Sequence, residues 1–237
     1  MSEKQSAENQ NGEKKATGNQ LIDGPRLLPA SGGPARQLVI LLHGVGADGN
    51  DLFALAPQLA QVLLDAAFVS PHAPEPFDMA PTGRQWFSLI DRTPDSIVRG
   101  ARKAASVLDA FIEAELVHHD LSDADLALVG FSQGTMMALY VALRRAQACA
   151  AIVGFSGALV DDDRGLSGGT AKPPILLVHG DADEVVPVAA HYDAVTRLLA
   201  AGFSVESHIR PGLPHGIDGP GLDYCKAFLA KHLAPAS

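Results

Sequence analysis

Short, nearly unbroken apolar runs alternate along the chain with longer helical stretches, and this alternation constrains the fold more than any other feature. The apolar runs that are expected to form strands are 37–42, 67–70, 125–129, 150–153, 175–178 and 204–210. The helical stretches between them are 51–64, 95–117, 133–147, 188–201 and 221–233. Strands that are apolar at nearly every position are typical of parallel sheets covered on both faces. We therefore expect an α/β protein with an open, mostly parallel sheet, whose reactive residues lie at the carboxyl ends of strands.

The chain begins with a polar segment that differs from everything after it. Its first twenty residues contain no Val, Ile, Leu, Phe, Tyr or Trp, so they cannot offset the entropy cost of becoming ordered. We expect a disordered tail over 1–24 and one domain over 25–237, without a large lid. The segment also lacks the apolar stretch of a secretory signal, and no run in the chain is long enough to cross a bilayer. These features predict a cytoplasmic protein with no stable membrane insertion.

Charge and cysteine content exclude two further classes. The formal net charge is -9, so the protein is not expected to bind nucleic acid. With only two cysteines in 237 residues, a disulfide scaffold is excluded as well.

A complete G-x-S-x-G motif, GFSQG at 130–134, lies between an expected strand and an expected helix. This context predicts a sharp turn that lifts the Ser132 hydroxyl above the sheet, with the glycines allowing strand and helix to pass closely. A similar sequence, GFSGA, places Ser156 after the next strand, but a loop with three aspartates at 161–163 follows it instead of a helix. Ser132 is therefore the candidate nucleophile, and Ser156 is interpreted as a turn residue near the site.

Serine needs a base, and the base needs an orienting acid. His215 is the candidate base because it lies in the loop between the last strand and the last helix, at a strand's carboxyl end. The acid is expected after the strand at 175–178, where Asp181, Asp183 and Glu184 are all chemically plausible. The order serine, acid, histidine along the chain is that of α/β-hydrolases.

The loop after the first clear strand, HGVGADG at 43–49, has two interpretations. It contains G-x-G-x-x-G, the dinucleotide fingerprint, but no acidic residue follows the next strand to bind a ribose. The favoured interpretation is an oxyanion hole, in which the backbone N–H groups of Val45 and Gln133 stabilise the developing negative charge.

Taken together, the segments LLHGVGADGNDL, FVSPHAPEP, GRQWFSL, VGFSQGTMMAL, HGDADEVVP and GLPHGID resemble the phospholipase/carboxylesterase family of small α/β-hydrolases, which includes acyl-protein thioesterases. The resemblance covers about residues 25–235. It implies Asp183 as the catalytic acid, Val45 and Gln133 as oxyanion donors, no cofactor and often a homodimer. Thioesterase-like members usually carry Asp after the Trp-Phe pair, whereas this chain carries Ser88, which weakens the implied preference for protein-bound thioesters.

These observations predict a serine carboxylesterase that acts on short- to medium-chain acyl esters, with thioesters and lysophospholipids as further substrate classes. Trp86, Phe87 and Phe77 are candidates to line the acyl pocket, and packing of the first two against the protein body is an equal alternative. The competing classes are a metal-dependent hydrolase using His179, Asp181 and Asp183, and a binding module without catalysis. We expect no metal, because no ligand cluster of usual spacing completes such a site.

Overall fold

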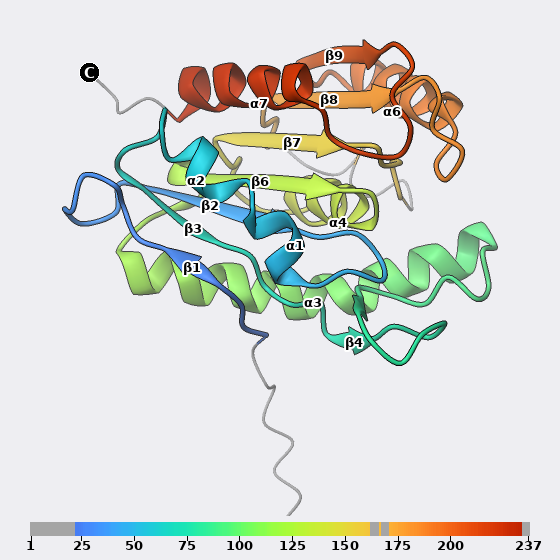
Figure 1. The fold of residues 1–237 in the computed structure, drawn as a ribbon, viewed down its shortest axis with the longest axis horizontal. Helices are drawn as coiled ribbons and strands as arrows, with labels where there is room; N and C mark the ends of the chain where they lie inside the picture. Colours follow the sequence, from blue (N-terminus) through green and yellow to red (C-terminus); the bar gives the residue numbers. More distant parts are fainter. Residues whose placement is uncertain (1–21, 162–165, 167–170, 234–237) are drawn as a thin grey trace, which may run out of the picture.

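The computed structural model describes residues 22–161, 166 and 171–233, and Figure 1 shows their arrangement around a central seven-stranded sheet. The order of strands across the sheet is β1-β3-β2-β6-β7-β8-β9. Their bounds are Arg26–Leu27 for β1, Gln37–Leu42 for β2, Ala66–Val69 for β3, Leu126–Phe131 for β6, Ala151–Phe155 for β7, Ile175–Gly180 for β8 and Val205–Arg210 for β9. Among the strands of the described residues, only β1 pairs antiparallel within this sheet. The expected open, mostly parallel sheet is confirmed.

Helices cover both faces of the sheet. The bounds are Gly49–Phe53 for α1, Ala56–Leu59 for α2, Pro94–His119 for α3, Gln133–Ala142 for α4, Val188–Ala200 for α6 and Gly219–His232 for α7, with a 3-10 helix, η1, at Asp123–Asp125. One hydrophobic core lies between the sheet and α3, α4 and α6, and a second lies between the sheet and α1, α2 and α7. Among the helices of the described residues, none combines the length and apolar character needed to span a membrane.

The two cores explain why the strands are apolar at nearly every position. Side chains alternate between the faces of a strand, and in β2 the residues Leu38, Ile40 and Leu42 enter one core while Val39 and Leu41 enter the other. All five are fully buried. Burial on both faces is what the unbroken apolar runs predict.

The expected helix over 51–64 is wrong, because two short helices, α1 and α2, occupy this stretch. Pro57 lies in the first turn of α2, where its ring would clash with the carbonyl of Phe53 if α1 continued. The helix expected over 133–147 ends earlier, at Ala142. Beyond it the chain turns so that Arg145 forms ion pairs with acidic residues of α3 and η1.

Three two-residue strands carry no periodicity that a sequence could reveal. They are β1, which extends the sheet next to β3, and β4 (Glu75–Pro76) and β5 (Arg84–Gln85), which form a small separate antiparallel pair. Part of the expected N-terminal tail also packs against the segment that follows β3. The amide of His72 donates to the carbonyl of Asp23, and a side chain at Gly24 would overlap the carbonyl of Ser70. Residues 1–21 of that tail lie outside the described residues.

The crossing of α4 over β2 and β6 is too close for side chains. A Cβ atom on Gly134 would lie 1.8 Å from the carbonyl oxygen of Leu42, and one on Gly130 would lie 2.4 Å from the backbone of Gly134. Real Cβ atoms do not approach backbone this closely, so both positions require glycine. This confirms the structural reason given for the two glycines of the motif.

We expect Gly134→Ala to lower the free energy of unfolding by about 3 kcal/mol or more, because α4 must shift away from β2 to admit the methyl group. Urea unfolding followed by circular dichroism measures this change. Gly219→Ala is the matched control, since this glycine starts α7 with no atom within 4 Å of an added Cβ, and we expect it to stay within about 0.5 kcal/mol of the parent. Equal stability of the two variants would contradict the close crossing.

Candidate active site

Ser132 lies at the turn between β6 and α4, in a backbone conformation that a serine seldom adopts. Its φ is 54° and its ψ is -116°, a strained combination for a residue with a side chain. The turn is held because the Ser132 amide donates to the carbonyl of Phe155, at 2.9 Å. The serine thus stands at the carboxyl edge of the sheet, beside the amino end of α4, as its motif predicts.

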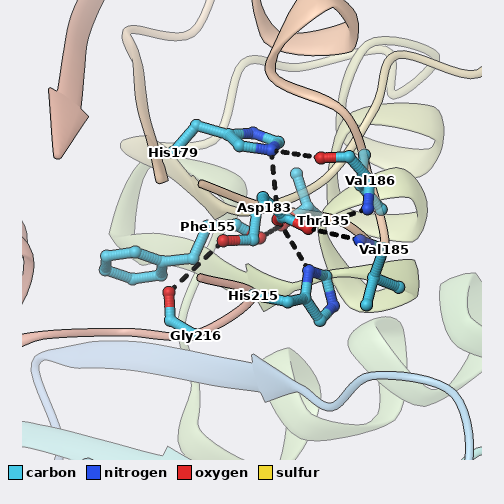
Figure 2. A network of polar contacts seen from close by, with 9 residues as sticks. Thr135, Phe155, His179, Asp183, Val185, Val186, His215 and Gly216 are labelled. Carbon is cyan, nitrogen blue, oxygen red and sulfur yellow. Dashed lines mark hydrogen bonds and ion pairs between the residues drawn. The ribbon is translucent and has the colours of Figure 1, made fainter. Parts of the chain in front are cut away.

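His215 and Asp183 are brought together from two loops at the same edge of the sheet. The Nδ1 atom of His215 lies 2.7 Å from Oδ2 of Asp183 (Figure 2). Asp183 follows β8, whereas His215 lies between β9 and α7. The ring of His215 also packs against Phe131, the residue before Ser132, with 4.9 Å between ring centroids. The histidine therefore lies between the acid and the end of the strand that carries the serine.

The carboxyl group of Asp183 is built to stay ionised. Burial opposes its ionisation, but the hydrogen bond from His215 and those from the amides of Val186 and Val185 outweigh burial, so its pKa lies below the ordinary value. The two amides donate to Oδ1 at 2.8 and 2.9 Å. A carboxylate in this state can hold an imidazole in one tautomer and stabilise its cation.

Of the three acids that the sequence offered, the structure brings only Asp183 to His215. Asp181 instead accepts a hydrogen bond of 2.6 Å from the amide of Gly212, at the start of the loop that carries the histidine. Glu184 is exposed. Sequence spacing could not select among these three acids, because all of them follow the same strand. The turn after β8 points their side chains in different directions.

His179 is a second histidine on the Asp183 carboxylate, and sequence reasoning considered it only as a metal ligand. Its Nε2 atom lies 2.8 Å from the carbonyl oxygen of Val186 and 3.2 Å from Oδ2 of Asp183 (Figure 2). Both neighbours are acceptors, so Nε2 carries the proton. The ring is almost fully buried, and it contacts the same carboxylate oxygen, Oδ2, that His215 contacts. The signal in the sequence was the spacing of four residues between His179, at the end of β8, and Asp183.

Ser156 supports the loop of the histidine. Its backbone has a positive φ of 48°, and its amide donates to the carbonyl of Val178. Its hydroxyl donates to the carbonyl of Gly216, at 3.3 Å, directly after His215. The similarity of its sequence to the nucleophile motif therefore reflects a strained turn, and the predicted position near the site is confirmed.

The expected oxyanion loop passes directly beside the serine. A Cβ atom on Gly44, the residue before Val45, would lie 3.3 Å from Cβ of Ser132. Gln133 is the first residue of α4, so its amide has no acceptor within the helix. His43 braces the loop because its Nε2 accepts from the amide of Ala73, at 3.0 Å. Burial lowers the pKa of His43, which keeps this imidazole neutral.

The Trp86-Phe87 pair is packed against the protein body. Both side chains are almost fully buried, and the indole N–H of Trp86 donates to the carbonyl of His43 at 3.0 Å. The side-chain amide of Gln133 accepts from the Trp86 amide and donates to the Phe87 carbonyl. This contact, which sequence reasoning missed, ties the pair to the first turn of α4 and favours packing as its role.

Phe77 occupies a different position from that pair. It is half-buried, and a Cβ atom on Gly46 would lie 3.4 Å from its ring. Among the candidate pocket residues it is therefore the one beside the oxyanion loop.

The glycines of the dinucleotide fingerprint face protein atoms. The amide of Gly46 donates to the carbonyl of Arg84, and that of Gly49 donates to Nδ1 of His72. Neither amide is directed at a site for a pyrophosphate. Within 22–161, 166 and 171–233, no three His, Cys, Asp or Glu residues are grouped so that they could hold a metal ion.

A family model described as Phospholipase/Carboxylesterase matches residues 28–233. The chain belongs to this family of ester-bond hydrolases. The resemblance of the sequence to this family is therefore confirmed. The central sheet and its covering helices form an α/β-hydrolase fold with no large lid in the described residues.

Individual relatives agree with the family match. Esterase YpfH of Escherichia coli is 32% identical over 206 residues, which cover 84% of this chain and 86% of that protein. Acyl-protein thioesterase 1 of Gibberella zeae is 25% identical over 213 residues, covering 83% and 91%. Among solved structures, esterase PE8 is similar with a TM-score of 0.85 and 41% identity, covering 90% of this chain and all of PE8.

The surroundings of His179 predict a pH dependence of stability. His191 touches the His179 ring edge-on and lies 2.7 Å from the Ser207 hydroxyl. Burial, helped by the neighbouring imidazoles, lowers the pKa of His191 to about 4. The unfolded chain takes up this proton near pH ~6.5, whereas the folded protein does so only near pH 4. Protonation therefore favours unfolding, and stability falls as pH is lowered between these values.

We expect His191 to account for about 2 kcal/mol of the loss in unfolding free energy between pH 7 and pH 5. His191→Gln has no imidazole that must stay neutral, so its loss of unfolding free energy between pH 7 and pH 5 should be smaller than that of the parent by this amount. Urea titrations at the two pH values measure the difference. The exposed His118→Gln serves as the control and should leave the loss unchanged. An undiminished loss in His191→Gln would show that the residue is not held neutral.

Proposed function

We propose that the protein is a serine carboxylesterase that hydrolyses short- to medium-chain acyl esters through Ser132, His215 and Asp183. The observation that carries this proposal is the 2.7 Å contact of His215 with an ionised Asp183, beside a serine on a strained turn. Family membership supports it independently.

In the proposed reaction, Ser132 Oγ attacks the carbonyl carbon of the ester while His215 takes up the hydroxyl proton. The carbonyl oxygen becomes negatively charged and is stabilised by the amides of Val45 and Gln133. The C–O bond to the alcohol then breaks as His215 returns the proton to the leaving oxygen, which gives an acyl-enzyme and a free alcohol. Water, deprotonated by His215, attacks the acyl carbon and releases the acid and the serine.

Asp183 holds the imidazole of His215 in the tautomer that these reaction steps need. With Nδ1–H donated to the carboxylate, Nε2 is free to accept the serine proton. The four donors on the Asp183 carboxylate fix its orientation before substrate arrives. Such preorganisation lowers the barrier, because no group must be reoriented during the reaction.

A thioester is the alternative substrate, since one relative is an acyl-protein thioesterase. The same triad would expel a thiolate in place of an alkoxide. Because Ser88 follows Trp86-Phe87 where thioesterase-like proteins usually carry an aspartate, we place oxygen esters first. Comparing kcat/KM for an ester and a thioester of the same acyl group separates the two.

A fluorophosphonate should react with Ser132 alone, because only an activated serine displaces fluoride from phosphorus at a useful rate. We expect one adduct by intact-mass spectrometry, mapped to the peptide containing Ser132. Ser132→Ala should give no adduct and no turnover while unfolding at the same urea concentration as the parent. An adduct elsewhere, or an active Ser132→Ala variant, would contradict the assignment.

Replacement of the acid should separate two aspartates that lie two residues apart. Asp183→Asn should reduce kcat by about 10⁴-fold, because an amide does not stabilise the imidazolium or fix its tautomer. Asp181→Asn is the matched control. Its carboxylate contacts a backbone amide of the loop, so a loss within about tenfold is expected. Rates of p-nitrophenyl butyrate hydrolysis measure both, and the reverse order would move the acid to Asp181.

A further inference from the structure

A pocket lies on the face of the sheet that α1, α2 and α7 cover, close to His215. It has a volume of about 220 Å³. Its lining residues are Asp51, Leu52, Leu55, Phe131 and Ile217. The lining is apolar except for the aspartate, whose side chain is exposed. Nothing in the proposed reaction so far uses this pocket.

Two of the lining residues connect the pocket to the catalytic groups. Phe131 directly precedes Ser132, and its ring packs against His215 at 4.9 Å between centroids. Ile217 follows His215 by two residues. The pocket therefore adjoins the histidine on the side of α1, whereas Phe77 lies beside Gly46 of the oxyanion loop.

In the proposed reaction His215 must return a proton to the leaving oxygen, and this requirement fixes how the substrate is oriented. The leaving oxygen has to approach the imidazole, so the alcohol portion of the ester extends on the histidine's side of the serine. The carbonyl oxygen faces the amides of Val45 and Gln133 instead. A pocket that touches the histidine and its loop is thus positioned for the alcohol portion.

We propose that the pocket formed by Leu52, Leu55, Phe131 and Ile217 binds the alcohol portion of the ester and selects small, neutral, apolar alcohols. This inference rests on the proposed esterase function. It assigns to the pocket a specificity for the leaving group, separate from the specificity for the acyl chain.

Volume and charge both define the class of alcohol. An apolar cavity of about 150 Å³ binds benzene, so 220 Å³ accommodates an alkyl chain of a few carbons or one aromatic ring. The carboxylate of Asp51 at the rim, together with a net charge of -9, opposes an anionic alcohol. A glycerophosphate leaving group carries a negative charge, which the apolar lining and Asp51 oppose. The pocket therefore favours simple esters over lysophospholipids.

The test uses acetate esters of methyl, ethyl, n-propyl and n-butyl alcohol with the full chain, so that only the alcohol changes. Burial of a methylene is worth about fourfold, and over the series kcat/KM should rise at least about tenfold. Leu55→Trp fills the pocket and should lower the ratio of n-butyl to methyl acetate about tenfold. Ile217→Ala enlarges it and should move the optimum to longer alcohols. Leu199→Trp, at an exposed position of α6, is the control and should leave the ratio unchanged.

A second substrate pair examines the charge. Asp51→Asn should raise the rate for acetylated glycolate, an anionic ester, by about two- to threefold relative to ethyl acetate at low salt, and 1 M salt should remove this gain.

The outcomes separate the two proposals. If no ester is hydrolysed and no fluorophosphonate adduct forms on Ser132, the esterase function fails. If esters are hydrolysed but Leu55→Trp and Ile217→Ala leave the alcohol series unchanged, the pocket assignment is overturned while the function stands. If these variants instead alter selectivity among ethyl esters of acetate, butyrate and hexanoate, the pocket binds the acyl chain and the assignment is equally overturned.

Discussion

The close crossing of α4 over β2 and β6 is the constraint from which the site follows. Gly134 rests against the carbonyl of Leu42, so α4 starts immediately after β6 and the chain must reverse within one residue. Ser132 occupies that residue at a positive φ. The strain there is held by the surrounding sheet, whose buried strands contribute far more than a turn costs. The same crossing brings Gly44 beside the serine, so the proposed nucleophile and the proposed oxyanion loop are positioned by one contact between backbones.

The Asp183 carboxylate organises the other half of the site. It accepts from two backbone amides and two imidazoles, which come from β8, the turn after it and the loop before α7. One anion thereby fixes two histidines with different chemistry. His215 is partly accessible, as the proposed base must be, whereas His179 is almost fully buried and contacts only the carboxylate and a backbone carbonyl among the polar partners described. A site in which one group has several partners is sensitive to single substitutions, since each partner is left with an unsatisfied polar atom.

Much of this arrangement could be predicted from sequence because its signals are local. The unbroken strands, GFSQG between strand and helix, and His215 after the last strand each depend on neighbours in the chain. Spacing alone could not separate Asp181 from Asp183, because the choice depends on which carboxylate meets a loop thirty residues away; only the family resemblance implied Asp183. The hydrogen bonds from the Gln133 side chain to the backbone of Trp86 and Phe87 could not be predicted either. They join residues far apart in the chain, and a single glutamine belongs to no recognisable sequence motif. The break between α1 and α2 was visible in Pro57, yet the apolar periodicity around it favoured one helix.

The loop that carries His215 is fastened at both ends, by Asp181 on the amide of Gly212 and by Ser156 on the carbonyl of Gly216. Because both ends of the loop are held, a residue inserted or deleted between them would move the imidazole of His215 away from Asp183. The exposed segment 78–82 between β4 and β5, by contrast, lies outside the main sheet and can change in length without displacing the strands that precede Ser132 and Asp183. Insertions and deletions during evolution should therefore accumulate in 78–82 and be purged from 212–216, so that the exposed segment diversifies while the position of His215 relative to Asp183 is inherited unchanged.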